Sequence, residues 1–193
     1  MSFGNGPRIV TNGLVLSLDA ADQNSYVSGS ATWNDLSGNG NNANITSSIG
    51  YSNSYLSFVS GSSGSINLPP LNYGSLNFSI TCWVYLNSLT TTNSTQGPLL
   101  FYNGASGSAA YYGQVTKSGS VAFVTTNGIL SQTQVTSTEN DVIKAGTWNN
   151  ILMAKSGSLM QIYVNGINKT AYTGSHPTVA SSTTNFLIGG AQL

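Results

Sequence analysis

The carboxylates are the first side chains that could do chemistry, and the sequence contains few of them. Glu139 is the only glutamate, and Asp141 is the carboxylate nearest to it, in "STENDVIKAG". Alternation along a strand would place both on one side, and two acids about 5 Å apart can cleave a glycosidic bond. The flanking Thr, Asn and Lys residues instead indicate a solvated loop. We therefore predict no catalytic residue in this stretch.

Nucleophilic catalysis has equally little support. A Ser/His/Asp triad would have to use His176, the only histidine, which precedes Pro177 in a Ser/Thr-rich stretch and is expected at the surface. Cys82, the only cysteine, lies in the apolar run "SITCWVYL" and is expected to be a small buried core residue. It cannot form an internal disulfide, and no base that could activate it is near in the sequence. The protein is therefore not expected to be an enzyme.

Three aspartates supply the oxygen atoms that a hard cation such as calcium prefers. Asp19 and Asp22 lie in "LDAADQNS", and Asp35 lies in "NDLSGNGNN". Asp and Asn also favour such turns without any metal, because their side chains bond to local backbone amides. No cofactor is expected, and calcium at these three residues is the alternative that stays open.

A carbohydrate site would need an exposed aromatic ring with amide or hydroxyl groups beside it. The candidate rings are Trp33, Tyr51, Tyr55, Tyr111 and Tyr112. Tyr111 and Tyr112 are adjacent, so they must point to opposite faces of a strand and one of them is expected to be exposed. By contrast, Trp83 and Trp148 sit inside apolar runs and are expected in the core. We take Trp33, Tyr111 and Tyr112 as the candidate carbohydrate-binding residues.

The composition excludes several classes of partner. The 193 residues include five Lys/Arg and five Asp/Glu, with a formal net charge of zero. Nucleic-acid binding depends on a field of basic residues, which this chain lacks. There is no apolar run of about 18 residues to cross a membrane, and the N-terminus does not resemble a secretory signal. Aromatic and β-branched residues throughout the chain indicate a folded, β-rich protein, in which low charge repulsion favours self-association.

Short apolar runs separated by turn residues predict an antiparallel sandwich or barrel. The expected strands are 13–19, 54–59, 65–68, 78–86, 98–103, 110–117, 120–126, 148–155, 159–164 and 185–189. Asn165-Gly166 is the strongest turn signal, because a type I′ turn needs positive φ at both central residues. Residues 1–12 are interpreted as an arm that leads into the first strand.

The segment "GTWNNILMAKSGSLMQIYVNGI", residues 146–167, predicts a hairpin with one apolar face. Alternation puts Ile151 and Met153 on one face and Asn150 and Leu152 on the other. Such a hairpin suits a sandwich in which the inner face of a sheet packs a core.

This hairpin resembles the central hairpin of the laminin-G-like, concanavalin A-like jelly-roll family, with its Gly-x-Trp, Gly-containing turn and Tyr-Val-Asn-Gly. "YLSFVSGSSGSINLP", "LNFSITCWVYLN" and "TNFLIGG" are similar to other strands of the family, in the family's order. The resemblance implies an all-β antiparallel sandwich, a single jelly-roll domain over residues 13–193. Relatives with this fold often hold calcium at a loop rim, which implies Asp19, Asp22 and Asp35 as ligands. Asn149 and Asn150 stand where the family often has His, and the paired-Glu strand of its glucanases is missing.

The front of the chain, "IVTNGLVLSLDAADQNSY" and then "TWNDLSGNGNNA", resembles jelly-roll domains in virion structural proteins of tailed bacteriophages, marine and cyanobacterial ones in particular. The family usually continues past "IGG" into a last strand near the first, and this sequence ends at Leu193. We therefore expect an open sheet edge beside strand 13–19, filled by another chain or by the arm.

Together these features predict a non-enzymatic virion protein, a capsid decoration or a tail or fibre component. Its expected partners are coat or tail proteins and further copies of itself, with weak contact to host glycans. It would be made in the host cytoplasm and located in the virion. The alternative is a free, lectin-like carbohydrate-binding module.

Overall fold

The computed structural model describes residues 10–46, 48–52, 54–58, 64–71, 77–89, 98–104, 109–127, 134–176 and 184–189. All regular structure in these ranges is β-strand, and every pairing between strands is antiparallel. None of the described residues forms a helix that could cross a membrane.

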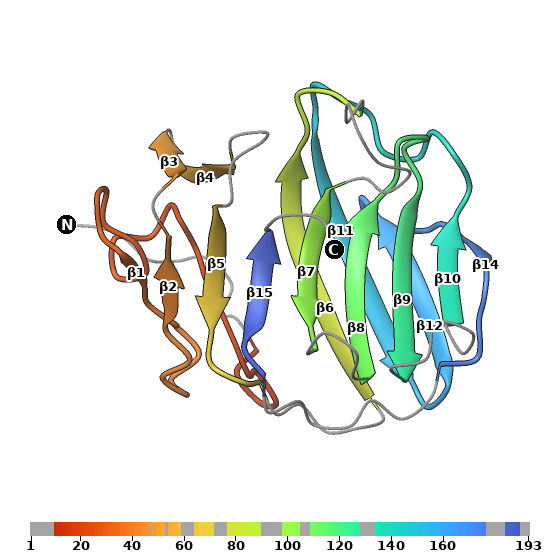
Figure 1. The fold of residues 1–193 in the computed structure, drawn as a ribbon, viewed down its shortest axis with the longest axis horizontal. Coiled ribbons are helices and arrows are strands. Elements are labelled where there is room, and N and C mark those ends of the chain that lie inside the picture. Colours follow the sequence, from red (N-terminus) through yellow and green to blue (C-terminus); the bar gives the residue numbers. More distant parts are fainter. Residues whose placement is uncertain are drawn as a thin grey trace.

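Two sheets face each other, and a small hairpin lies beside them (Figure 1). The larger sheet contains, in spatial order, β1 (Thr32–Trp33), β2 (Ala43–Ile45), β5 (Ser65–Leu68), β15 (Phe186–Gly189), β7 (Leu99–Asn103), β8 (Ala109–Val115), β9 (Val121–Asn127), β10 (Gln134–Thr138) and β14 (Thr170–Tyr172). The smaller sheet contains β13 (Ile167–Asn168), β12 (Leu159–Val164), β11 (Trp148–Ser156) and β6 (Asn77–Tyr85). The hairpin is β3 (Ile49–Ser52) and β4 (Tyr55–Phe58). The antiparallel sandwich predicted from the sequence is confirmed.

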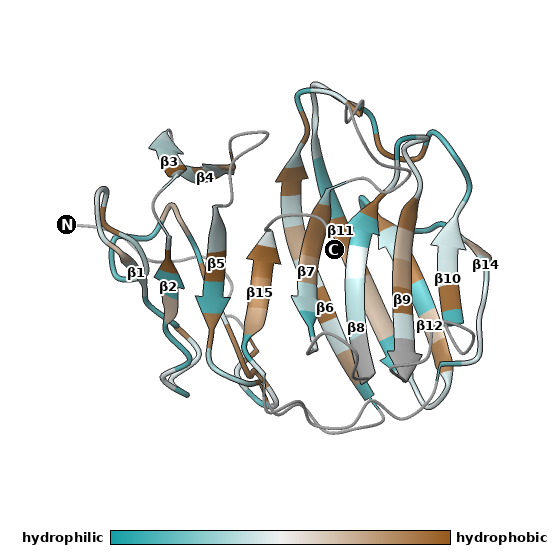
Figure 2. Cartoon of the chain, viewed as in Figure 1, coloured by the Kyte–Doolittle hydropathy of each residue, from teal (hydrophilic) through white to brown (hydrophobic). Residues whose placement is uncertain are grey.

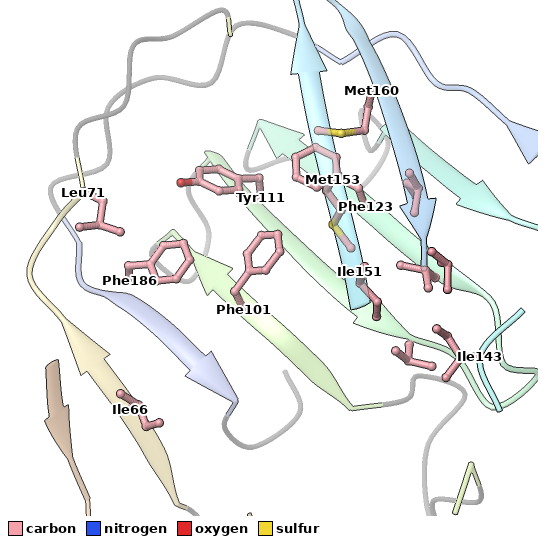
Figure 3. Packing of buried hydrophobic residues seen from close by; sticks show 14 of the residues in the cluster. Ile66, Leu71, Phe101, Tyr111, Phe123, Ile143, Ile151, Met153, Met160 and Phe186 are labelled. Atoms are coloured by element: carbon pink, nitrogen blue, oxygen red, sulfur yellow. The ribbon is translucent and has the colours of Figure 1, made fainter. Parts of the chain in front are cut away.

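The core lies between the inner faces of the two sheets. Figure 3 shows Tyr111, Phe123 and Met153 gathered between strands of both sheets. Gly113 allows a close approach of the two sheets, because a Cβ built there would lie 2.5 Å from Phe101 and 2.9 Å from the Met153 methyl group. Figure 2 shows the hydrophobic bands that β6, β7 and β15 contribute.

Most of the predicted strands lie within a residue or two of the observed ones. The strands expected at 65–68 and 159–164 have those bounds as β5 and β12. Asn165 and Gly166 have φ angles of 51° and 79°, which confirms the positive φ expected at both turn positions. The short strands β1, β2, β3, β10, β13 and β14 were not predicted.

The strand predicted at 13–19 is wrong, because this segment makes its hydrogen bonds to a loop, mostly to side chains of that loop, instead of to another strand. The Ser17 N–H donates to Asp35 Oδ1 at 2.9 Å, and the Leu36 N–H donates to the Ser17 carbonyl at 2.8 Å. The amide groups of Asn39 and Asn41 both donate to the Val15 carbonyl. A loop of Asp, Ser and Asn thus takes the place of a neighbouring strand. Most of the expected arm, residues 1–9, lies outside the described residues.

The carboxylate of Asp35 organises that loop. Its Oδ1 accepts the N–H groups of Ser17 and Ser37, and its Oδ2 accepts the Ser37 hydroxyl and the Asn41 N–H, all within 3.0 Å. Partial burial alone would raise the pKa of Asp35, but these hydrogen bonds outweigh it, and the pKa lies below its ordinary value. The turn-rich stretch 32–43 is therefore held to residues 15–17 by hydrogen bonds that centre on Asp35.

The surface position predicted for His176 is also wrong. The ring is 1% exposed and packs edge-on against Phe123. Its Nδ1 lies 2.9 Å from Thr125 Oγ1, and its Nε2 lies 2.7 Å from Thr136 Oγ1. A neutral imidazole has one donor and one acceptor, and a hydroxyl can serve either, so both ring nitrogens are satisfied. Burial and then the nearby Lys155 ammonium lower the pKa of His176 to about 4.

Replacing Asp35 should loosen the N-terminal segment. We expect Asp35→Ala to lower the free energy of unfolding by about 2–3 kcal/mol, since several donors lose a charged acceptor. Asp22→Ala is the matched control, because among the described residues the Asp22 carboxylate accepts hydrogen bonds from Asn24 alone. This substitution should cost at most about 1 kcal/mol. Because the folded pKa of Asp35 is depressed, its contribution is present at neutral pH and is lost as the pH falls through that pKa. Urea unfolding of both variants measures the difference, and equal losses would contradict it.

The buried histidine should make stability depend on pH in a defined window. As the pH falls below about 6.5, the unfolded chain binds a proton that the folded His176 does not take up until about pH 4. Stability should therefore be nearly full above about pH 7 and fall by about 3 kcal/mol by the time the pH reaches about 4. His176→Gln should flatten the curve in that window. Lys155→Met should raise the folded-state pKa of His176, so that the loss is smaller and ends at a higher pH. A fall of undiminished size in His176→Gln would show that other groups are responsible.

Candidate functional site

The outer surface of the four-stranded sheet carries aromatic side chains where the sequence predicted core residues. We call the outer aromatic face the side chains that alternate with the core on three strands: Thr81, Trp83, Tyr85, Trp148, Asn150, Leu152, Gln161 and Tyr163. Trp83 is 67% exposed and Trp148 is 47% exposed. The prediction that both tryptophans lie in the core is therefore wrong.

Strand alternation explains why these residues face solvent. In β6 the inner row is Phe78, Ile80, Cys82 and Val84, and the outer row is Asn77, Ser79, Thr81, Trp83 and Tyr85. The polar residues of the outer row therefore lie on the same face of the strand as its two aromatic residues. The alternation of polar residues in the sequence could have indicated that Trp83 faces solvent, but the apolar run "TCWVY" obscured it. Cys82, in contrast, points inward as predicted, and burial raises its pKa to about 11.

Trp148 is held in place by two tyrosines from different elements. Its ring centroid lies 5.6 Å from that of Tyr85, its cross-strand partner, and 5.7 Å from that of Tyr55 in β4, in an edge-on arrangement. Edge-on and tilted pairs of this kind are favourable because ring edges and faces carry opposite partial charges. Tyr55, one of the predicted platforms, therefore supports the outer aromatic face from one side.

Asn150 supplies a polar group beside the rings. It lies directly across from Trp83 on the neighbouring strand. Its amide Nδ2 donates to Thr81 Oγ1 at 3.3 Å and to the Cys82 carbonyl at 3.5 Å, and its N–H donates to Asn165 Oδ1. The carboxamide is thus fixed, so a ligand could bond to it without first ordering it.

The outer aromatic face has no charged member. Lys155 of β11 is on the opposite, inner face, where it is 3% exposed and its ammonium donates to the Gly157 carbonyl. A surface of rings, amides and hydroxyls without charge suits a neutral ligand that presents both C–H and O–H groups.

The three residues predicted to bind carbohydrate do not come together. Tyr111 is 1% exposed and its hydroxyl accepts from Asn103 Nδ2 at 2.7 Å, so it belongs to the core and is not a platform. Trp33 of β1 is half-buried and packs edge-on against Tyr26, and four strands lie between β1 and β8 in the sheet order. Tyr112 points to the opposite face from Tyr111, as alternation requires, and stands beside Tyr102. Burial, and secondly the nearness of Tyr102, raises the pKa of Tyr112.

The predicted calcium ligands are engaged locally. Asp19 Oδ1 accepts the Ala21 N–H, Asp22 Oδ1 accepts from Asn24, and both oxygens of Asp35 accept the donors described above. Within the described ranges no three His, Cys, Asp or Glu side chains cluster as metal ligands would. Calcium at these residues stays a prediction. Glu139 and Asp141 lie exposed in the loop after β10, as expected.

Residues 60–192 match the family described as the concanavalin A-like lectin/glucanases superfamily, which is more than half of the chain. The chain belongs to this family. No curated protein matches the sequence.

Three solved structures are similar to the fold. A botulinum neurotoxin type C structure, solved in a study of ganglioside-dependent cell entry, has a TM-score of 0.69 and 14% identity, covering 95% of this chain and 44% of its own. A Trypanosoma rangeli sialidase has a TM-score of 0.63 and 18% identity, covering 100% of this chain and 29% of its own. Domain 4 of the arabinanase AbnA of Geobacillus stearothermophilus, in complex with arabinotriose, has a TM-score of 0.55 and 17% identity, covering 92% and 84%. At these identities the likeness establishes the fold, and the chain spans less than half of the toxin and sialidase chains.

The exposure of the tryptophans can be tested by stability. Trp83→Ala should change the free energy of unfolding by less than about 1 kcal/mol, because the ring buries little area in the folded protein. Phe123→Ala, which empties the core, should cost about 3–5 kcal/mol. Denaturant unfolding compares the two, and a loss of core size for Trp83→Ala would contradict this placement.

Proposed function

We propose that this protein is a non-enzymatic adhesion module that binds neutral glycans through the outer aromatic face. One observation carries the proposal: Trp83 and Trp148 are exposed together in an uncharged row, with the fixed amide of Asn150 beside them. Indole rings stack on the C–H faces of sugar rings, and the amides and hydroxyls around them can bond to sugar hydroxyls. An exposed tryptophan adds little to folding stability, whereas exposed apolar patches commonly mark binding sites.

Two further observations support this function over catalysis. The only glutamate, Glu139, lies exposed in the loop that follows β10, with Asp141 as its only near carboxylate in the sequence. The similar domain of AbnA was solved with arabinotriose, which supports a sugar as the class of ligand for this fold.

We place this module in the virion of a tailed bacteriophage, as a capsid decoration or a tail or fibre component. The support is the resemblance of residues 9–26 and 32–43 to jelly-roll domains of such virion proteins. Adhesion to neighbouring coat or tail subunits would hold the protein on the particle, and the outer aromatic face would contact host surface glycans.

Binding to neutral polysaccharides tests the ligand class. A glycan array followed by titration calorimetry should give a hit that free sugar competes away. Trp83→Ala and Trp148→Ala should each weaken it about tenfold or more, as expected for an aromatic residue central to binding. Tyr172→Ala is the matched control, since Tyr172 is 62% exposed but lies on β14 of the other sheet. No competable hit, or equal losses in all three variants, would overturn glycan binding at this face.

The virion setting is tested separately. An antibody against the chain should label purified particles of the phage that carries its gene, and the protein should co-sediment with them. Unlabelled particles would exclude the virion setting. Co-sedimentation that persists in Trp83→Ala, together with an empty glycan array, would instead favour a purely structural adhesion role.

A further inference from the structure

The smaller sheet ends in one long strand that has a neighbour on only one side. Among the described residues, β6 pairs with β11 and with no other strand. In the described part of the two large sheets the other three end strands are short, since β13 and β1 have two residues each and β14 has three, whereas β6 has nine. Very short edge strands are a common way to prevent further pairing, and β6 is without that protection.

The hydrogen bonds of β11 show which backbone groups of β6 face the open side. The Asn165 N–H donates to the Asn150 carbonyl at 2.9 Å, so the even-numbered residues of β11 direct their backbone groups toward β12. The odd-numbered residues therefore direct theirs toward β6, where Ile151 is paired with Cys82 and Met153 with Ile80. The other set of β6 residues consequently points its N–H and C=O groups to the open side: Asn77, Ser79, Thr81, Trp83 and Tyr85.

The side chains of β6 also lack the features that usually discourage pairing. The strand reads "NFSITCWVY", without a charge, a proline or a glycine. Its inner residues Ile80, Cys82 and Val84 remain half-buried, whereas Ile151 and Met153 on the neighbouring strand are each 1% exposed. A further strand beside β6 would complete their burial.

We infer that a second copy of this chain supplies that strand, so that two β6 strands pair antiparallel about a two-fold axis at Thr81. In this register Thr81 lies opposite its own counterpart, Ser79 opposite Trp83, and Asn77 opposite Tyr85. These are the residues with outward-pointing backbone groups, so the pairing forms roughly ten inter-chain hydrogen bonds.

The same register matches the inner and outer rows. Phe78 lies opposite Val84 and Ile80 opposite Cys82, so every inner side chain meets an apolar one. Facing threonines are a favourable cross-strand pair. An uncharged edge that is complementary to itself fits an isologous dimer, since no partner of opposite charge is needed. The two small sheets become one sheet of eight strands, with both outer aromatic faces on the same side.

Solution mass tests the dimer directly. Sedimentation equilibrium of the full chain at tens of micromolar should give twice the 20.0 kDa chain mass. Thr81→Lys places two like charges at the axis and should raise the dimer dissociation constant at least tenfold. Gln161→Lys adds the same charge to the same face on β12, away from the axis, and should leave the dimer intact. A monomeric wild type, or a dimer that Thr81→Lys leaves unchanged, would overturn the inference.

Two further variants test the edge and the register. Ser79→Pro removes an N–H that the chain itself does not use in the β6–β11 pairing, so it should abolish the dimer while the melting transition is retained. In a Cys82→Ala background, Thr81→Cys should form an inter-chain disulfide on mild oxidation, since opposed Cα atoms at about 5.5 Å permit one. Ala154→Cys, on the same face of β11, is the control. Equal cross-linking of the two cysteine variants would contradict the register.

Neither test depends on a sugar. A dimer without glycan binding would refute only the proposed ligand, and glycan binding by a monomer would refute only this inference.

Discussion

The contact on which the rest of the structure depends lies where Phe101 and Met153 meet across Gly113. The missing side chain at Gly113 lets the two sheets approach, since a Cβ there would lie within 3 Å of both neighbours. This approach determines which residues of β8 and β11 face the core. Because paired strands share a register, alternation then determines which residues of the neighbouring strands face the core. Tyr111 and Phe123 are inside for this reason, and Trp83 and Trp148 are outside. A shift of one residue in register would exchange the two sets.

Much of the fold was predictable because its information is local. Alternating apolar residues and turn residues located β5 and β12 at their observed bounds, and Asn165-Gly166 specified its turn. The core was predicted less well, because an adjacent pair such as Tyr111 and Tyr112 reveals that the two residues face opposite ways but not which one faces inward. Only the pairing with β7 and β9 decides that. In β6, the polar residues Ser79 and Thr81 did carry the answer for Trp83.

The other wrong predictions concern residues whose hydrogen-bond partners are side chains from distant parts of the sequence. The apolar run at 13–19 looks like a strand, yet its polar groups are satisfied by Asp35, Asn39 and Asn41 from a loop twenty or so residues away. Nothing in the run itself distinguishes this from pairing with a strand. His176 is similar, since only the threonines of β9 and β10, brought together by the sheet, make a buried neutral imidazole acceptable. Such partners are non-local, and a single sequence does not identify them.

The scarcity of charge connects the outer aromatic face with the open edge of β6. A chain with five basic and five acidic residues has little repulsion to keep exposed rings and unpaired strands apart. Most proteins with this problem place a lysine on the edge strand or shorten it. Among the end strands described for the two large sheets, β1, β13 and β14 are short, whereas β6 is long and uncharged and contains Trp83. A two-fold pairing closes on itself, so it would satisfy that edge in a dimer of fixed size, without unlimited growth. It would also leave the aromatic rings of both copies side by side and open to a ligand, which extended stacking of sheets would cover.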